Sequence, residues 1–453
     1  MKIIVVGCGK IGSTIIDSLI SEGHNVIAVD SNPQILSDIC NIYDIIGICG
    51  SGTDCNTLIE SGADKADLFV AATGSDEFNM LSCYLAKKMG AKNTVSRIRN
   101  PEYNDQSLGF LRQNLDISLS INPERLMAHE IFNILKFPSA VKIETFSHRS
   151  YEMVEFFLKE TSPFCDMNLI EIRKKFDAKF LVCAVSRKDT VYIPSGDFIL
   201  RAGDRVGIIS SPAELHKLFK RLVPEQKQIK NIMLAGASRT TYYLAKLLTS
   251  AGAHTKILDR ERARCEELCE AVPKAVVICG DPADSEVLIE EGIDNVDAFV
   301  ALTGFDEENI LLSFTASNHN VPKVISKVNR EAFANVASKL GLDCLLSPKQ
   351  LVSNIIVRYA RALENSIESS HVEKLYKLMD GRAELLEFII KSDNEATNIP
   401  LKDLNLKSNV LVCGIIRNRK PIVPNGDDII KAGDHVIVLT SGHRMNDVTD
   451  ILN

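Results

Sequence analysis

Short apolar runs alternate with amphipathic segments over the first thirty residues. Residues 2–6 form a nearly continuous apolar run rich in β-branched side chains, which is typical of a strand buried on both faces of a parallel sheet. Residues 13–21 carry apolar side chains at helical spacing, and residues 25–29 form a second apolar run that ends in Asp30. The pattern predicts a strand, a loop, a helix and a second strand.

The same pattern occurs a second time in the chain. Residues 3–30 correspond to residues 232–259, with Gly7 matched to Gly236 and Asp30 matched to Asp259 at an offset of 229 residues. Later landmarks keep this spacing to within a few residues. A repeat of roughly 230 residues is too long for a solenoid unit and long enough for about two domains. The sequence therefore predicts a tandem duplication with four domains.

Each copy is expected to contain a large and a small domain. The first part of each copy predicts an α/β fold with a Rossmann-like, doubly wound parallel sheet. The second part has alternating strands separated by the turn dipeptides Gly203-Asp204 and Gly433-Asp434, which indicates a small α/β module. The predicted domains are residues 1–137, 138–223, 230–364 and 371–453. Hinges are expected at Pro138 and residues 364–370, and a linker between the copies at residues 224–230.

Two amphipathic segments, residues 124–136 and 349–363, are more apolar than a surface helix needs. They are expected to pack either on a partner subunit or in the core of their own domain.

The first loop, Gly7 to Gly12, reads GCGKIG between a predicted strand and a predicted helix. In that context Gly7 permits a tight turn, Gly9 admits a pyrophosphate and Gly12 lets the helix lie against the sheet. The amides that open the helix then face the phosphates. Asp30 stands where a carboxylate binds ribose hydroxyls, and its charge favours NAD(H) over NADP(H). The alternative is a set of turn glycines with a helix-capping aspartate.

Two later strands end in polar residues. The run at residues 68–72 is followed by Thr73-Gly74, which either offers donors to a ligand or only ends the strand. Residues 94–98 carry Arg97, and Arg99 follows on the same side. One arginine is expected to meet a phosphate or a neighbouring subunit, and an exposed salt bridge is the alternative.

The corresponding loop of the second copy has lost part of the pattern. Ser238 and Thr241 replace two of the three glycines. Their side chains are expected to hinder a pyrophosphate and to push the helix from the sheet. Asp259 and Arg239 still allow ribose and phosphate contacts, so this domain either binds a smaller ligand such as ADP or ATP or has lost its ligand.

Composition excludes several classes of protein. The net charge of −7 without a basic patch argues against nucleic acid. The apolar runs are shorter than a membrane helix, and the sequence enters a strand without a leader, so a soluble protein is expected. The twelve cysteines lack CxxC pairs, which fits a reducing cytoplasm. Cys265 and Cys269 have no histidine nearby to complete a metal site, so no metal is predicted. Cys8 is interpreted as a small loop residue.

These motifs resemble a known family. The GCGKIG loop with Asp30, Thr73-Gly74, the stretch SRIRNPEY at residues 96–103 and SGDFILRAGDRV at residues 195–206 are similar to the Trk potassium-uptake regulatory proteins, the TrkA family with tandem RCK (KTN) domains. The resemblance implies a peripheral protein on the cytoplasmic face of the membrane. It also implies a homo-oligomeric ring, a dimer or tetramer, under a separate integral-membrane potassium-translocating subunit. NAD(H), ATP or ADP would bias the ring and gate the flux.

The resemblance also carries residue roles onto this sequence. The nucleotide contacts would fall on Gly7, Cys8, Gly9, Lys10, Ile11, Gly12, Asp30, Thr73, Gly74 and Arg97. The second-copy equivalents would be Gly236, Ala237, Ser238, Arg239, Thr240 and Asp259, where Ser238 and the following Thr241 depart from the family pattern.

A ligand-driven switch without covalent chemistry is the function that these features favour. An NAD-dependent oxidoreductase is the alternative, but none of the nine histidines belongs to a catalytic constellation and no catalytic residue is predicted. A regulator of another cation channel or of an efflux system is a further alternative. The sequence leaves open which nucleotide activates, whether the second site is occupied, the size of the ring and the membrane partner.

Overall fold

A computed structural model describes residues 1–103, 105–146, 151–176, 179–188, 190–222, 228–364 and 370–453. The chain forms two compact units. Unit 1 contains residues 1–132 and 230–360, and unit 2 contains residues 133–229 and 361–453. The predicted linkers at residues 224–230 and 364–370 lie largely outside the described residues. The predicted domain boundaries remain predictions.

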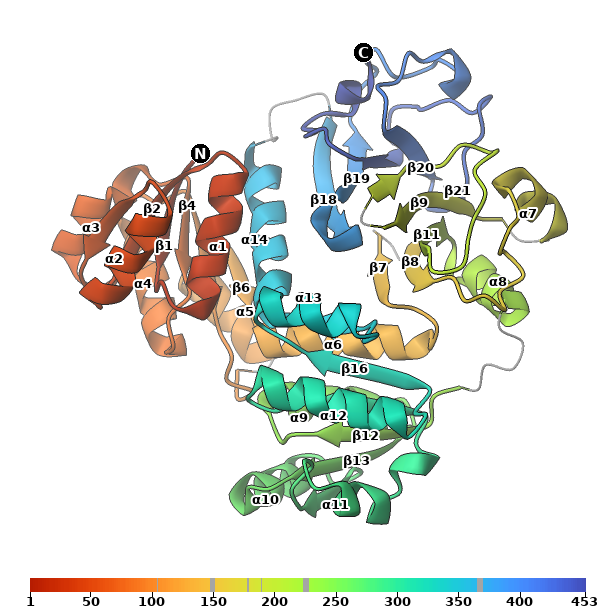
Figure 1. Cartoon of the computed structure of the whole chain (residues 1–453). Helices are drawn as coiled ribbons and strands as arrows, with labels where there is room; N and C mark the ends of the chain where they lie inside the picture. The colour runs from red at the N-terminus through yellow and green to blue at the C-terminus, as the bar shows by residue number, and fades with distance from the viewer. Residues whose placement is uncertain (104, 147–150, 177–178, 189, 223–227, 365–369) are drawn as a thin grey trace. The chain divides into compact units, whose positions relative to one another are not determined.

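The first sheet of unit 1 is parallel and has the order β3-β2-β1-β4-β5-β6. Figure 1 labels β1, β2, β4 and β6 of this sheet. Its strands are β1 (Lys2–Val6), β2 (Asn25–Asp30), β3 (Ile46–Cys49), β4 (Leu68–Ala71), β5 (Asn93–Arg97) and β6 (Leu119–Ile121). The helices between them are α1 (Lys10–Ser21), α2 (Pro33–Ile42), α3 (Cys55–Ser61), α4 (Asp76–Met89) and α5 (Asp105–Asn114). The doubly wound fold predicted for this part is confirmed.

Local sequence explains where these elements begin. The central strand β1 is buried on both faces, as its apolar run predicts. Helix α2 begins where the Asn32 side chain accepts hydrogen bonds from two first-turn amides, with Pro33 at the first helical position. The sequence pattern did not predict edge strand β3. This strand has only four residues and most of them are exposed, so apolar and polar residues do not alternate clearly.

The second sheet of unit 1 repeats the first, with the order β14-β13-β12-β15-β16-β17. Its strands are β12 (Asn231–Ala235), β13 (His254–Asp259), β14 (Val276–Cys279), β15 (Ala298–Ala301), β16 (Lys323–Lys327) and β17 (Leu345–Leu346). Its helices are α9 (Arg239–Ser250), α10 (Arg262–Ala271), α11 (Ser285–Glu290), α12 (Asp306–Asn318) and α13 (Glu331–Lys339). The matching order of strands agrees with the duplication read from the sequence.

The two amphipathic segments are helices α6 (Pro123–Lys136) and α14 (Pro348–Glu364), and each meets the other copy. The Ser353 hydroxyl of α14 donates to the carbonyl of Thr14 in α1 at 3.4 Å, and the two helices lie side by side in Figure 1. At the start of α6, Asn122 donates to the Tyr243 hydroxyl of α9 at 3.1 Å. Each helix thus contacts the other copy within its own chain, and packing on a partner subunit stays a prediction.

Unit 2 contains two five-stranded sheets with antiparallel pairing, in the orders β10-β9-β11-β8-β7 and β18-β19-β22-β20-β21. The strands are β7 (Lys142–Thr145), β8 (Glu152–Phe157), β9 (Leu181–Arg187), β10 (Thr190–Tyr192), β11 (Arg205–Ser210), β18 (Ser370–Leu378), β19 (Ala383–Ile390), β20 (Val410–Arg417), β21 (Lys420–Ile422) and β22 (His435–Thr440). Helices α7 (Leu169–Lys175) and α8 (Pro212–Leu222) of the first module correspond to the short 3-10 turns η5 (Leu401–Asp403) and η6 (Val448–Ile451) of the second.

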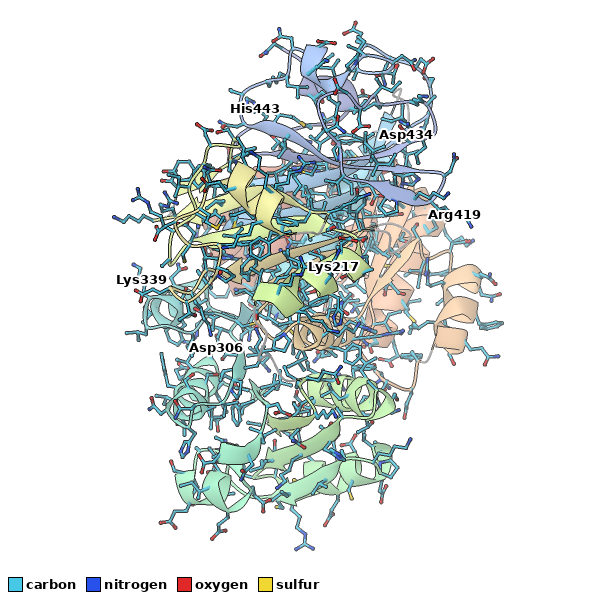
Figure 2. All side chains as sticks on the ribbon, turned by 90° about the vertical axis from the view of Figure 1, so that its right-hand side faces the viewer. Lys217, Asp306, Lys339, Arg419, Asp434 and His443 are labelled. Carbon is cyan, nitrogen blue, oxygen red and sulfur yellow. The ribbon has the colours of Figure 1, made fainter. Side chains whose placement is uncertain are left out.

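The predicted Gly-Asp turns lie directly before the strands β11 and β22. Gly203 and Gly433 have positive φ angles of 84° and 87°. Each following aspartate is buried and pairs with an arginine: Asp434, labelled in Figure 2, meets Arg417 at 2.7 Å, as Asp204 meets Arg187. The aspartate of each turn therefore also forms an ion pair, which the Gly-Asp sequence alone does not predict.

The helices in the described part of the chain include no segment with the length and apolar character that membrane crossing requires.

Candidate functional site

The first glycine loop joins β1 to α1. Gly7 has a φ angle of +88°, and a Cβ there would lie within 3 Å of the Thr73 backbone. A Cβ on Gly12 would lie 1.8 Å from the Gly7 carbonyl oxygen. Both glycines are thus required by the protein itself. Gly9 differs, because a Cβ there would meet nothing within 4 Å. Packing within the protein therefore does not require glycine at this position, and the space above Gly9 is open to a ligand.

The N-terminus of α1 is open toward this space. Its cap residue is Gly9, and no side chain caps the helix. The first-turn amides of such a helix point outward and favour an anion. Gly7, Gly9, Lys10 and Ile11 all line one cavity of about 1220 Å³. This exceeds the roughly 300–1,000 Å³ of ordinary small-molecule pockets, so a dinucleotide has room.

Asp30 stands at the end of β2 and lines the same cavity. One of its carboxylate oxygens accepts the Cys8 amide at 2.7 Å, and the other accepts the Asn32 amide at 2.8 Å. Each oxygen keeps lone-pair capacity for a ribose hydroxyl. Asp30 therefore shapes the glycine loop besides facing the cavity, so its removal disturbs both the loop and any ligand.

Thr73, after β4, is held by Asn79, a residue that the sequence reading missed. The amide and hydroxyl of Thr73 donate to Asn79 Oδ1 at 2.9 and 2.7 Å. Asn79 Nδ2 donates to the carbonyls of Thr73 and Arg97 at 3.2 and 3.0 Å. The fully buried Asn79 thus ties the ends of β4 and β5 together beside the cavity. Thr73 and Gly74 both line the cavity, and a Cβ on Gly74 would meet nothing within 4 Å.

Asn79 with its four hydrogen bonds is called the clamp below. The second copy has an equivalent clamp at Asn309, which accepts the Thr303 amide at 2.8 Å and donates to the carbonyls of Thr303 and Lys327. The repeated pattern of Asp76-Glu77-x-Asn79 and Asp306-Glu307-x-Asn309 is the signal that could have found it.

Removing the clamp should separate stability from binding. Asn79→Ala removes the acceptor of the Thr73 amide and a donor to the Arg97 carbonyl, so we expect the free energy of unfolding to fall by about 2–4 kcal/mol. Asn309→Ala should cost a similar amount. Asn79→Ala should weaken nucleotide binding more than Asn309→Ala, because Asn79 holds Thr73 and Arg97 of the cavity lining, whereas Asn309 holds only Lys327 of that lining. Denaturant unfolding and calorimetry check both variants, and equal binding losses in the two would contradict the assignment.

Asp306, labelled in Figure 2 at the start of α12, accepts the Arg330 amide at 2.9 Å and the Asn329 side chain at 3.1 Å. Burial alone would raise the pKa of this carboxyl, but hydrogen bonds from Asn329 and Arg330 outweigh burial and lower the pKa below its ordinary value. A lowered pKa in the folded state means that the charged form contributes stability above about pH 4, and that this contribution is lost as the pH falls further.

We therefore expect Asp306→Asn to lower the free energy of unfolding at pH 7 by about 1–2 kcal/mol. The difference from the parent should shrink as the pH falls below about 4. Urea unfolding at pH 7 and at pH 3 checks this, and a difference that is independent of pH would contradict it.

The two arginines of the β5 edge have different surroundings. Arg97 donates from Nη1 to the Thr73 carbonyl at 3.1 Å, while its buried Nε has no hydrogen-bond partner among the described residues. Burial and then the charge of Arg99 lower the pKa of Arg97, and Arg239 of the second copy adds to this. Arg99 instead pairs with Glu124 at 2.6 Å. Both arginines line the cavity, and Arg97 keeps a buried Nε donor without a partner among the described residues.

The second loop is closed by its own side chains. The Ser238 hydroxyl accepts the Thr241 amide at 3.3 Å, and the Thr241 hydroxyl accepts the Ser238 amide, which forms a capping box at the start of α9. The buried Thr241 hydroxyl also donates to the Gly236 carbonyl. Asp259 accepts the Ala237 and Glu261 amides as Asp30 does, but it is buried. The amides that an anion would need at α9 are thus already partly satisfied.

The two loops nevertheless face one cavity. Ala237, Ser238, Arg239 and Thr240 line it together with Gly7 and Asp30. Its charged lining consists of the cations Lys10, Arg97, Arg99, Arg239, Arg264, Lys327 and Lys349 and the anions Asp30, Glu102, Glu124 and Glu267. The excess of cations suits a phosphorylated ligand. Cys8, Gly12, Gly236 and Asp259 are not cavity-lining residues, so these predicted contacts support the loops rather than face the space.

Cysteine chemistry is unfavourable at the first loop. Burial, and then the charge of Asp30, raises the pKa of the Cys8 thiol to about 12, so the thiol stays protonated. Among the described residues, no cluster of three or more histidine, cysteine or acidic side chains could hold a metal ion.

The fold and this site define a class: a protein with two Rossmann-type domains in tandem, one with an open glycine loop and one with a closed loop. The chain belongs to the TrkA family, because the TrkA-N domain matches residues 3–114 and 232–348 and the TrkA-C domain matches residues 153–223 and 385–453.

Relatives in the same family match this chain over nearly its whole length, and a solved structure shares its fold. The Trk system potassium uptake protein TrkA homolog of Archaeoglobus fulgidus is 29% identical over 451 residues, which cover 100% of both chains. The TrkA of Vibrio alginolyticus is 28% identical over 97% of this chain and 95% of its own. A structure of the GsuK channel bound to NAD has a TM-score of 0.64 at 16% identity and covers 97% of this chain and 77% of that chain. The latter supports the fold alone.

Proposed function

We propose that the chain is the nucleotide-binding regulatory subunit of a Trk-type potassium uptake system, and that it gates potassium flux through a separate membrane subunit. The observation that carries this proposal is the open loop at Gly9, which lies in a cation-rich cavity shared with the second copy. The names of full-length relatives in the TrkA family support the link to potassium uptake.

The ligand that fits best is NAD(H), with ATP or ADP as the alternative. The first-turn amides of α1 would bind the phosphates, and Asp30 would accept the ribose hydroxyls and repel a 2′-phosphate. The predicted contacts of the first copy that line the cavity would form this site: Gly7, Gly9, Lys10, Ile11, Asp30, Thr73, Gly74 and Arg97. In the second copy, Ser238 and Thr241 occupy the helix start, so Arg239 would serve the shared ligand instead of a complete second site.

A ligand shifts a conformational equilibrium only by the difference in its affinity for the two states. A ligand held at Gly9 and Arg239 touches both copies, so its binding changes when the copies move relative to each other. A shift from 1:99 to 99:1 requires about 5.5 kcal/mol, which several sites in a ring of two or four chains would share. The ring would act as a peripheral protein on the cytoplasmic face of the membrane, and no covalent step is needed.

Two measurements test the proposal. Calorimetric titration of NADH, NAD, ATP and ADP into the full chain should show binding of at least one nucleotide. Potassium flux into vesicles that contain a co-purified Trk-type membrane subunit should then depend on the chain and on that nucleotide. Binding without any effect on flux would refute the regulatory role, and co-purification with an efflux protein or another cation channel would reassign it.

One observation favours an NAD-dependent oxidoreductase as a second candidate. Tyr242 lines the cavity, and Lys246 donates to its hydroxyl, so a proton donor stands near a bound dinucleotide. No histidine lines the cavity within the described part of the chain. NADH consumption with a panel of carbonyl compounds tests this candidate. Turnover that is lost in Tyr242→Phe would favour the enzyme.

A further inference from the structure

Two cysteines of the second Rossmann domain lie together at the edge of its sheet. Cys265 is on α10 and Cys279 ends β14, where its Cα is paired with that of Asp259 in β13. The Cys265 sulfur lies 3.3 Å from the Asp259 carbonyl oxygen and 3.8 Å from the Ile278 carbonyl oxygen. Ile278 directly precedes Cys279 in β14, so the Cys265 sulfur lies against the strand end that carries Cys279. The helix and the strand therefore bring the two cysteines together.

The two thiols differ in access to solvent. Cys279 is exposed, whereas Cys265 is a buried residue of α10. Burial, followed by the neighbouring Cys279 and Asp259, raises the pKa of Cys265 to about 11, which keeps this thiol protonated. An oxidant from solvent would thus meet Cys279 first, with Cys265 directly behind it. An accessible thiol next to a second thiol is the arrangement of a reversible redox site.

We propose that Cys279 and Cys265 are a thiol modification site that reduces hydroperoxides and closes to an intrachain disulfide. The Cys279 thiolate attacks the peroxide, the O–O bond breaks, and Cys279 becomes a sulfenic acid as an alkoxide or hydroxide leaves and takes a proton from solvent. The Cys265 sulfur then attacks the sulfenic sulfur, the S–O bond breaks, the S–S bond forms and water leaves with the Cys265 proton. The two thiols lose two electrons and the peroxide gains them. A small dithiol reverses the step by thiol–disulfide exchange.

The position of the pair links this chemistry to the cavity. Helix α10 also carries Arg264 and Glu267, which line the cavity shared by the two glycine loops. A disulfide would pin α10 to β14 beside them. Oxidation is therefore expected to change how the cavity accepts a phosphorylated ligand. This last consequence rests on the proposed function, whereas the disulfide itself does not.

The first copy provides a natural control. Asp30 is paired with Cys49 in β2 and β3 just as Asp259 is paired with Cys279, so Cys49 is the equivalent of Cys279. At the position of Cys265, however, the first copy has the buried Leu36 on α2. Cys49 is exposed like Cys279 but has no thiol at the equivalent place behind it. The two copies therefore differ in the residue directly behind the exposed thiol, while Cys40 of α2 lies against Gly47 of β3.

The experiment treats the full-length reduced chain with hydrogen peroxide and maps the products by mass spectrometry after digestion. We expect a linked pair of peptides carrying Cys265 and Cys279, with the loss of two hydrogen atoms, which dithiothreitol restores. Cys49→Ser should keep this product, and Cys279→Ser should lose it. In Cys265→Ser, Cys279 should instead proceed to sulfinic acid, as Cys49 does in the parent.

The disulfide and its effect on nucleotide binding are tested by separate measurements. If Cys279 of the parent proceeds to sulfinic acid as fast as Cys49, or if Cys279 links to Cys269 instead, the proposed pair is refuted. Nucleotide titration of the oxidised and reduced chain then tests the link to the cavity separately. Unchanged affinity would refute that link and leave the disulfide standing.

Discussion

Gly9→Val should lower nucleotide affinity by at least about 100-fold, a loss of about 2.7 kcal/mol of binding free energy, while the chain stays folded. The backbone of Gly9 is extended, with a φ angle of −67°, so valine adopts it without strain. A Cβ there meets no atom of the protein within 4 Å. The new side chain would therefore occupy only the space that a pyrophosphate needs above the first turn of α1.

This prediction is checked by measuring the free energy of unfolding and the nucleotide affinity of Gly9→Val. Because glycine is a better helix N-cap than valine, the free energy of unfolding should fall by about 1 kcal/mol, which leaves the chain folded. The matched control is Gly304→Val in the second copy, which also has open space around its Cβ but does not line the cavity. Calorimetry should show parent affinity for the control. Parent affinity in Gly9→Val as well would remove the loop from the site.

The sequence predicted the sheets well because their signals are local. Strand β1 and the loop that follows it read directly from an apolar run and three glycines, and the 229-residue offset then carried the same prediction to the second copy. Edge strand β3 lacks such a signal, since half-exposed residues of a short edge strand have no consistent period. Asn79 was missed for another reason: its role depends on two strand ends that meet only in the folded sheet.

The sequence did not predict that the two glycine loops face the same cavity. The residues of the second loop predict a weakened separate site, because sequence spacing says nothing about which loop faces which. Helices α6 and α14 each contact the other copy, and the cavity contains residues from both loops. The substitution of two glycines by Ser238 and Thr241 thus closes one helix terminus and still leaves Arg239 beside the other copy's ligand space.

Arg239→Ala should therefore weaken binding at the first loop, although Arg239 belongs to the second. A charge-assisted hydrogen bond to phosphate contributes about 1.5–3 kcal/mol, so the affinity should fall roughly 10- to 150-fold. The loss should be larger for ATP than for NAD, because ATP carries more negative charge. Arg97 remains in place, and its interaction with the charge of Arg239 puts both guanidinium groups near the same ligand space.

Stoichiometry separates this prediction from a model with two independent sites. A shared ligand gives one nucleotide per chain, and Arg239→Ala weakens that single binding event. Independent sites would give two per chain, and Arg239→Ala would leave the first with parent affinity. The control is Arg260→Ala, an exposed arginine of the same domain that does not line the cavity. Calorimetry on the full chain measures the number of sites and the affinity in one titration, and parent affinity in Arg239→Ala would place the ligand on the first copy alone.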